Sequence, residues 1–286
     1  MKSATGYLEL LVLSLLIGAF IGGCASSGST QSTNTGGGNS STSAFGNKNV
    51  PKVCSKPVSD VNTDLAEKQE LGDIHLQLGV GYMMQDKLDT ALAEINEAIE
   101  LMPSSATAYS ALALLEIRMN RIDDARKSYK RALRLEPGDP ELNNNYGHFL
   151  CQQGEYLAAD KRFQCALANP LYKTPWRAYY NGGICALKAG ELKQADIYLR
   201  TTRQLRPDLP QTLYYLADLS YQRGGNLQAA DYLKRYHESV TPEAESLWLG
   251  VQIARKLNDQ DMEASYTMSL KNLFPDSDQA QMLYTQ

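Results

Sequence analysis

The sequence predicts an all-α solenoid of about six helix-turn-helix units, and three observations support this fold class. Marker residues recur about every 34 residues after Asp64, and self-similarity at a fixed period is the signature of a repeat architecture. Small residues recur where two helices would cross, with large side chains beside them, so that the backbones can approach closely. Prolines follow the second helix of most units, because the proline ring stops a helix.

The N-terminus has the form of a signal peptide that ends at a cysteine. Lys2 precedes an apolar stretch from Leu10 to Ile21, which is shorter than the roughly 20 residues that span a bilayer. The residues "IGGC", which end at Cys24, resemble the lipobox of bacterial lipoproteins. In that motif the cysteine sulfur is alkylated with diacylglycerol and the chain is cut just before the cysteine. The alternative is an ordinary signal peptide with an incidental cysteine.

The lipobox resemblance implies that residues 1–23 are removed and that Cys24 is lipidated. Cys24 would carry covalent diacylglycerol and a further acyl chain such as palmitate, and these chains anchor stably because each buried CH₂ contributes ~0.8 kcal/mol. Ala25 follows the cysteine, and in Gram-negative lipoproteins a residue other than aspartate here implies the outer membrane. We therefore expect a lipid-anchored protein that faces the periplasm and needs no other cofactor.

A polar segment separates this anchor from the repeats. Residues 25–49 are almost entirely Ser, Thr, Gly, Asn and Gln, a composition that cannot bury enough apolar surface to fold. The sequence therefore predicts a flexible linker over residues 24–63, with a typical reach of about 35 Å.

The repeats follow the pattern of tetratricopeptide repeats. The segment from His75 to Pro103 places Gly79, Tyr82 and Ala91 at the spacings of that motif. A step of 36 rather than 34 residues locates a two-residue insertion within 169–183. We predict a right-handed superhelical tetratricopeptide-repeat domain over residues 64–286, in which a degenerate last unit resembles a cap. The alanine markers of the second helices are Ala91, Ala125, Ala159, Ala195, Ala229 and Ala264, and the repeats are 72–105, 106–139, 140–173, 176–209, 210–243 and 244–277.

Composition and motifs argue against several function classes. The chain has 28 Lys plus Arg against 32 Asp plus Glu, a net charge of −4, so the sequence carries no basic footprint for nucleic acid. Three histidines, five cysteines and the carboxylates form no cluster of catalytic spacing, no metal motif and no phosphate-binding loop. We therefore expect a protein-interaction scaffold rather than an enzyme, with no catalytic residue, metal or small-molecule substrate.

The histidines have structural interpretations. His75 occupies an aromatic packing position of the first repeat. His148 falls on the expected concave face beside Gln152, where it could touch a ligand. His237 lies near the end of a helix, where a positive charge favours the helix dipole.

The cysteines other than Cys24 suggest one disulfide, because an exported chain meets an oxidising compartment. Cys151 and Cys185 lie at nearly the same level of first helices that should stack side by side. Cys165 lies about seven residues of helix from Cys151, or ~10 Å, beyond the ~7 Å limit for bridged Cα atoms. A Cys151–Cys185 disulfide is favoured, with separate free thiols as the alternative. Cys54 in the linker is either free or intermolecular.

The concave face is the default binding surface of a helical array. In the first repeat its expected residues include Leu76, Val80, Met83 and Met84, an apolar set that predicts a partner-binding groove. The alternative is that the linker, or residues 58–65, covers this face as an N-terminal cap.

One block of the sequence is more specific than the repeat pattern. The stretch from Asn143 to Asp196, with "ESLWLGVQIARKLND" and "LFPDSDQAQML" near the end, resembles the type IV pilus biogenesis and stability family of outer-membrane tetratricopeptide-repeat lipoproteins. The resemblance implies a pilotin, which binds the pilus secretin subunit and promotes its outer-membrane localisation and multimerisation. It also implies Cys24 as the lipidated residue and the first-repeat groove as the secretin contact. The alternative function is a scaffold lipoprotein in outer-membrane protein assembly or cell-wall synthesis.

Overall fold

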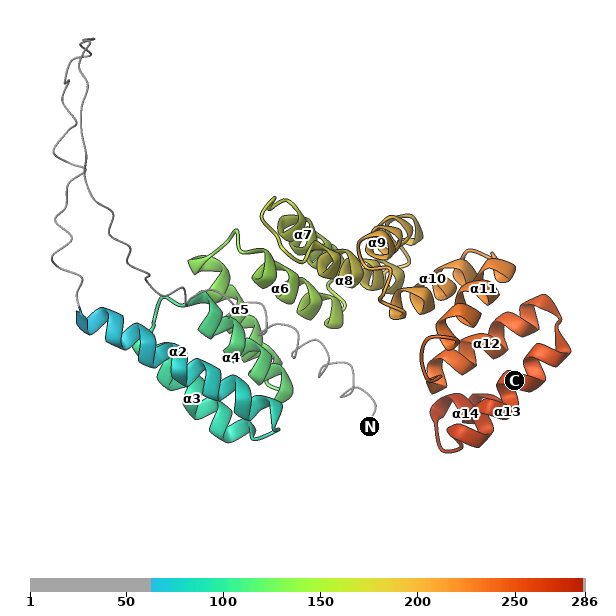
Figure 1. Cartoon of the computed structure of the whole chain (residues 1–286), viewed down its shortest axis with the longest axis horizontal. Coiled ribbons are helices and arrows are strands. Elements are labelled where there is room, and N and C mark those ends of the chain that lie inside the picture. Colours follow the sequence, from blue (N-terminus) through green and yellow to red (C-terminus); the bar gives the residue numbers. More distant parts are fainter. Residues whose placement is uncertain (1–62, 285–286) are drawn as a thin grey trace, which may run out of the picture. The chain divides into compact units, whose positions relative to one another are not determined.

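The computed structural model describes residues 63–284 (Figure 1). The predicted signal peptide, Cys24, Cys54 and nearly all of the predicted linker lie outside these residues. The described part of the chain is helical and contains no strand, which confirms the predicted all-α class. None of its helices is long and apolar enough to cross a membrane. The helices are α2 (Thr63–Met84), α3 (Leu88–Leu101), α4 (Ala106–Arg118), α5 (Ile122–Leu135), α6 (Pro140–Gln152), α7 (Tyr156–Leu167), α8 (Pro175–Lys188), α9 (Leu192–Leu205), α10 (Gln211–Gln222), α11 (Asn226–His237), α12 (Ala244–Leu257), α13 (Gln260–Leu273) and α14 (Asp278–Met282).

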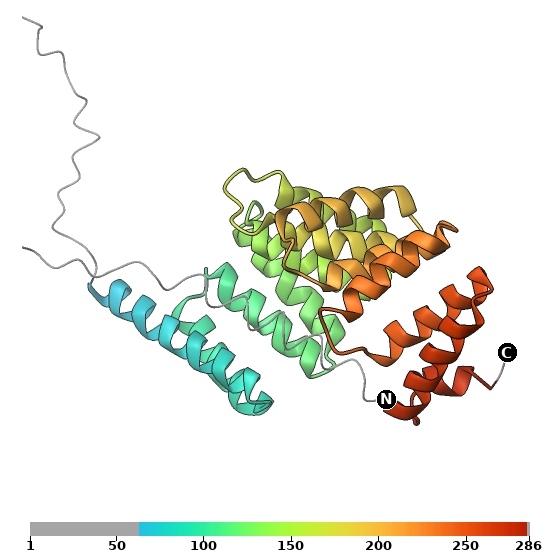
Figure 2. The ribbon, with the colours of Figure 1, turned by 45° about the vertical axis from the view of Figure 1, so that its right-hand side comes forward.

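The chain divides into two compact units, one ending at Ala125 and the other beginning at Arg126. The boundary falls within α5. In the first unit α2 and α3 lie side by side in both views (Figures 1 and 2). Gly79 permits this contact, because a Cβ there would lie 2.6 Å from the Ile95 side chain. The core of the unit is formed by Val80, Met83, Ala91, Ile95, Ala111 and Leu115.

The second unit repeats one packing solution along its hairpins. The alanine markers Ala159, Ala195 and Ala229 are fully buried in α7, α9 and α11. A Cβ added to Gly147 would lie 2.8 Å from the ring of Phe163, so only glycine lets α6 approach α7 this closely. The predicted marker Ala264 is wrong, because it is exposed on α13. In this last hairpin Gly250 instead lies against Tyr266.

The two-residue insertion falls in the connection between α7 and α8, residues 168–174. This connection is fixed to the preceding turn and to α6. The Asn169 side chain donates to the carbonyl of Gly138 at 3.3 Å, and the Thr174 hydroxyl donates to Glu141 at 2.5 Å. Arg177, at the start of α8, adds an ion pair to Glu141 at 3.4 Å. The extra residues therefore form an ordered link between the two hairpins.

The short helix α14 packs onto the last hairpin. Its Ala280 is buried with Leu247 of α12 and Leu270 of α13. The Ser277 hydroxyl caps the helix by accepting from the backbone N–H of Ala280 at 3.1 Å. Helix α14 thus covers apolar surface that α12 and α13 would otherwise expose.

Candidate partner-binding surfaces

The structure corrects the predicted groove of the first repeat. Val80 and Met83 are only 5% and 1% exposed, and both belong to the core of the first unit. Leu76 is half-buried against the same core, and Met84 is 40% exposed. The prediction that these four residues line one open groove is therefore wrong for Val80 and Met83.

The reason for this burial is that α2 contacts α4 as well as α3. Val80 and Met83 pack against Ala111 and Leu115 of α4, so the positions expected to face a groove are filled from within the unit. Polar contacts also hold the C-terminal end of α2 against α4. The Arg118 guanidinium donates to the carbonyl of Met83 and to Asp86 at 3.0 Å.

A different apolar surface of α2 is exposed. Leu71, Ile74 and Leu78 are 46%, 46% and 44% exposed, and we call them the α2 stripe. Spacings of three and four residues place them on one side of the helix, away from the side that buries Gly79 and Met83. Gly81 continues this side toward the end of α2, and a Cβ added there would meet no atom of residues 63–284 within 4 Å. Within the described part of the chain, the stripe is therefore open to a partner.

Helix α2 is apolar on two sides, which is uncommon in a helix with one side in solvent. A surface helix normally carries one apolar face and one polar face, and exposed apolar patches mark interaction sites. The stripe was visible in the sequence as Leu, Ile and Leu at spacings of three and four. Reasoning from the inward positions of a standard repeat missed it, because that rule considers only the concave face.

The predicted packing histidine ties α2 to α3. His75 Nδ1 lies 2.7 Å from Glu94 Oε2, and both side chains are about one quarter exposed. This contact fixes the rotation of α2 about its axis, and so helps to hold the α2 stripe outward. His75 has a structural role here.

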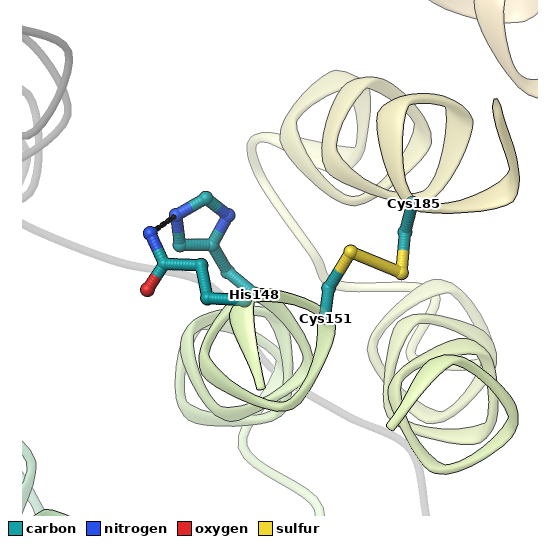
Figure 3. The surroundings of a disulfide bond; sticks show 4 residues. His148, Cys151 and Cys185 are labelled. Atoms are coloured by element: carbon teal, nitrogen blue, oxygen red, sulfur yellow. Dashed lines mark hydrogen bonds between the residues drawn. A yellow bond between two sulfur atoms is a disulfide. The ribbon is translucent and has the colours of Figure 1, made fainter. Parts of the chain in front are cut away.

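In the second unit, Cys151 of α6 and Cys185 of α8 form a disulfide, with their Cα atoms 5.7 Å apart. Figure 3 shows the bond between the two helices, with the His148 ring pointing away from it. Cys165 forms no disulfide within residues 63–284 and is exposed. The disulfide joins first helices of neighbouring repeats across the longer connection. A bridge over a loop of about this size contributes about 3–4 kcal/mol.

His148 lies on the side of α6 that the sequence places on the concave face. The Gln152 side-chain amide donates to its Nε2 at 3.0 Å, which favours the neutral ring with the proton on Nδ1. Burial and, to a smaller extent, the positive charge of Lys188 on α8 together lower the pKa of His148 to about 4. His148 is therefore neutral at physiological pH and cannot serve there as a cationic anion-binding group.

His237 and Ser246 resemble a base and a nucleophile by distance alone, with 2.9 Å between Nε2 and the hydroxyl oxygen. The Ser246 hydroxyl, however, donates to the Glu243 carbonyl at 2.9 Å and accepts from the Glu243 N–H. Ser246 is only 1% exposed. Burial also lowers the pKa of His237. Ser246 forms a capping box with Glu243 at the start of α12, and His237 is hydrogen-bonded to this buried hydroxyl, so a substrate could not reach it.

Within residues 63–284, no group of three His, Cys, Asp or Glu side chains is placed to hold a metal ion. The surface that the described residues offer to a partner is the apolar α2 stripe on a repeat scaffold. Such a fold and such surfaces define a tetratricopeptide-repeat protein whose chemistry is the binding of other proteins.

Comparisons with known proteins place the chain within this class. The tetratricopeptide-repeat family model matches residues 76–140 and 110–160. The chain is 31% identical over 210 residues to the type IV pilus assembly protein PilF of Pseudomonas aeruginosa, covering 73% of this chain and 83% of PilF. The chain therefore belongs to the tetratricopeptide-repeat family of type IV pilus biogenesis.

Two solved structures agree with this assignment. That of Pseudomonas aeruginosa PilF has a TM-score of 0.69 and 30% identity, and covers 77% of this chain and 99% of PilF. That of PilW, a widely conserved type IV pilus biogenesis factor, has a TM-score of 0.72 and 31% identity, and covers 75% of this chain and 99% of PilW.

Proposed function

We propose that this protein is an outer-membrane lipoprotein that acts as a pilotin for the type IV pilus. It binds the secretin subunit and promotes the localisation of the secretin to the outer membrane and its assembly into multimers. The observation that carries the proposal is the 31% identity to a type IV pilus assembly protein across 83% of that protein's length. The lipobox-like sequence that ends at Cys24 supports the proposed localisation to the outer membrane.

The α2 stripe is the proposed secretin contact. Leu71, Ile74 and Leu78 are each nearly half exposed, and full burial of an aliphatic side chain contributes about 1.5–3 kcal/mol. Covering the exposed parts of three such side chains is enough to select an apolar partner segment. An amphipathic helix suits a stripe of this spacing, because its own apolar residues recur every three or four positions.

The lipid anchor and the linker would position the α2 stripe near the outer membrane. Lipidated Cys24 would hold the chain at the inner leaflet of the outer membrane, facing the periplasm. A linker of about 40 residues allows a typical reach of roughly 35 Å. The repeat array could then hold a secretin subunit beside the bilayer that the subunit enters.

The test measures SDS-resistant secretin multimers by immunoblot in cells that lack this protein and in cells that carry its variants. We expect loss of multimers in the deletion strain. We also expect loss with Leu71→Asp combined with Leu78→Asp. The matched control combines Leu157→Asp with Leu227→Asp, two leucines that are 83% and 78% exposed on α7 and α11, and should leave multimers unchanged.

Normal multimers in the deletion strain would overturn the pilotin proposal, and a defect in barrel assembly or cell-wall synthesis there would favour the scaffold function instead. Normal multimers in the stripe variant alone would move the contact to another surface. The address has its own test, because Cys24→Ala should release the protein from the outer-membrane fraction. Full retention of that variant would contradict lipid anchoring at Cys24.

A further inference from the structure

Helix α5 carries a row of basic side chains on its outer side. Lys127, Lys130 and Arg134 are exposed and Arg131 is half-buried. Their spacings of three and four residues put all four on one side of the helix, opposite the buried Tyr129 and Ala132. At 1.5 Å per residue the row is roughly 10 Å long. We call these four residues the α5 stripe.

The same positions in the other hairpins lack this charge. Counted from the buried alanine of each second helix, the α5 stripe occupies the second, fifth, sixth and ninth following positions. Helix α3 has two acidic residues at these positions, and α7 and α9 have one basic residue each. The set in α11 has two basic and two acidic residues. The basic row is thus specific to α5 and not a property of the repeat. The equivalent sets are Ala93, Asn96, Glu97 and Glu100; Lys161, Gln164, Cys165 and Ala168; Ile197, Arg200, Thr201 and Gln204; and Asp231, Lys234, Arg235 and Glu238.

Two members of the stripe are available for an external anion. Lys130 and Arg134 form no ion pair with any residue of the described chain. By contrast, Arg200 at the equivalent position of α9 is paired with Asp196 at 2.6 Å. The whole chain has a net charge of −4, so an anionic surface would be repelled by the molecule on average and attracted at the α5 stripe.

We propose that the α5 stripe docks on the phosphate headgroups of an anionic phospholipid surface, and so orients the second unit at the membrane. The inference rests on the proposed membrane address, because an anchored chain meets headgroups within the reach of its linker. Lysine is depleted in protein interfaces, whereas basic clusters bind anionic lipid at about 1 kcal/mol per side chain. The exposed part of the row also lacks the aromatic anchor that is typical of a protein hot spot.

The test uses the full chain with Cys24→Ala, so that lipidation does not set the binding. Flotation is measured with vesicles of phosphatidylcholine and with vesicles of phosphatidylcholine and phosphatidylglycerol in equal parts. The neutral vesicles give the baseline from apolar segments. We expect extra binding to the anionic vesicles, and we expect Lys130→Gln with Arg134→Gln to weaken it roughly 25-fold, about fivefold per side chain.

The matched control is Lys193→Gln with Lys234→Gln, which removes the same charge from exposed positions of α9 and α11. It should change binding less than twofold. An equal loss in the control would show that only net charge matters, and would overturn the proposal. Equal binding to neutral and anionic vesicles would overturn it as well.

Two further measurements distinguish anionic lipid from other anionic ligands. Displacement by inorganic phosphate, but not by sodium chloride of equal ionic strength, would assign the stripe to a free anion. Binding to polyglutamate without binding to anionic vesicles would assign it to an acidic protein. Either result would overturn lipid docking. None of these measurements involves secretin, so the pilotin proposal can fail while this one stands.

Discussion

Helix α2 of the first unit and helices α6 and α8 of the second unit use their side chains differently. In the first unit, α2 buries one apolar side against α3 and α4 and exposes another, the α2 stripe. In the second unit, α6 and α8 turn polar groups toward each other. Asn181 donates to Asn144 at 3.0 Å, and a disulfide joins the same two helices. Helix α2 thus presents an exposed apolar stripe to a partner, whereas α6 and α8 hold each other by a polar contact and a covalent bond.

This difference teaches that one repeat motif can supply both a binding element and a rigid element. Apolar contacts are non-directional, so the exposed side of α2 can accept partners of various sequence. Buried amides and a disulfide are directional and fix one arrangement of α6 against α8. The predictions below either break this contrast or measure it, from the largest expected effect to the smallest.

The largest effect is expected from a charge placed on the buried side of α2. Met83→Asp would bury a carboxylate in the core of the first unit, where Met83 is 1% exposed. The expected loss is about 5 kcal/mol of unfolding free energy, because the variant both loses apolar contacts and desolvates a charge. Hydrogen exchange should show unfolding of α2 and α3 with α8 and α9 still protected. Equal loss of protection in both units would contradict this expectation and show that they unfold together.

Removal of the disulfide should have the next largest effect, in the second unit. Cys151→Ser with Cys185→Ser should lower the unfolding free energy by about 3–4 kcal/mol, as measured by urea denaturation. Reduction of the wild-type chain should give the same loss, and reduction of the double variant should give none. The control is Cys165→Ser, an exposed free thiol, which should change stability very little. A stable double variant would show that the amide contacts between α6 and α8 suffice.

A pH effect is expected from His148. Its pKa is lowered to about 4 in the folded protein, against about 6.5 for an unfolded chain. Between pH 4 and pH 6.5 the unfolded state therefore binds more protons than the folded state. The contribution of His148 to the free energy of unfolding is fully present above pH 6.5 and is lost as the pH falls toward 4. We expect ~1–2 kcal/mol over this window, because solvent screening weakens the effect at a half-buried ring. His148→Gln should flatten this part of the stability curve, and an unchanged curve would contradict the assignment.

The repeat fold was predictable from the sequence because a fixed period leaves few alternatives. Gly147 and Phe163, or Gly79 and Ile95, are each a small residue matched to a large one across a helix crossing, and both recur in register. The disulfide could be favoured for the same reason, since Cys151 and Cys185 occupy neighbouring levels of stacked helices. The spacing of such residues along the repeats can be read directly from a single sequence.

The binding surface was less predictable, because exposure depends on what the rest of the unit covers. The pattern gave Val80 and Met83 the same status as Met84, yet α4 buries the first two and leaves the third exposed. Nothing in the local spacing of α2 states how closely α4 approaches. Likewise Ala264 fits the alanine pattern by spacing, although Gly250 and Tyr266 set the crossing of the last hairpin. Burial is a property of the packed unit.

The smallest effect on stability is expected at the α2 stripe, and this makes it the sharpest test of the contrast. Leu78→Gln removes apolar surface from a side chain that is 44% exposed, so the unfolding free energy should change by less than about 0.5 kcal/mol. Met83→Gln, five residues further along and on the buried side, should cost several times more, since it leaves a polar group in the core. Secretin binding, measured by co-purification, should follow the opposite order among folded variants: Leu78→Gln should weaken it although the protein stays stable. A large loss of stability from Leu78→Gln would mean that the stripe is covered by the protein's own chain, and the exposed side of α2 would then belong to the fold and not to a partner.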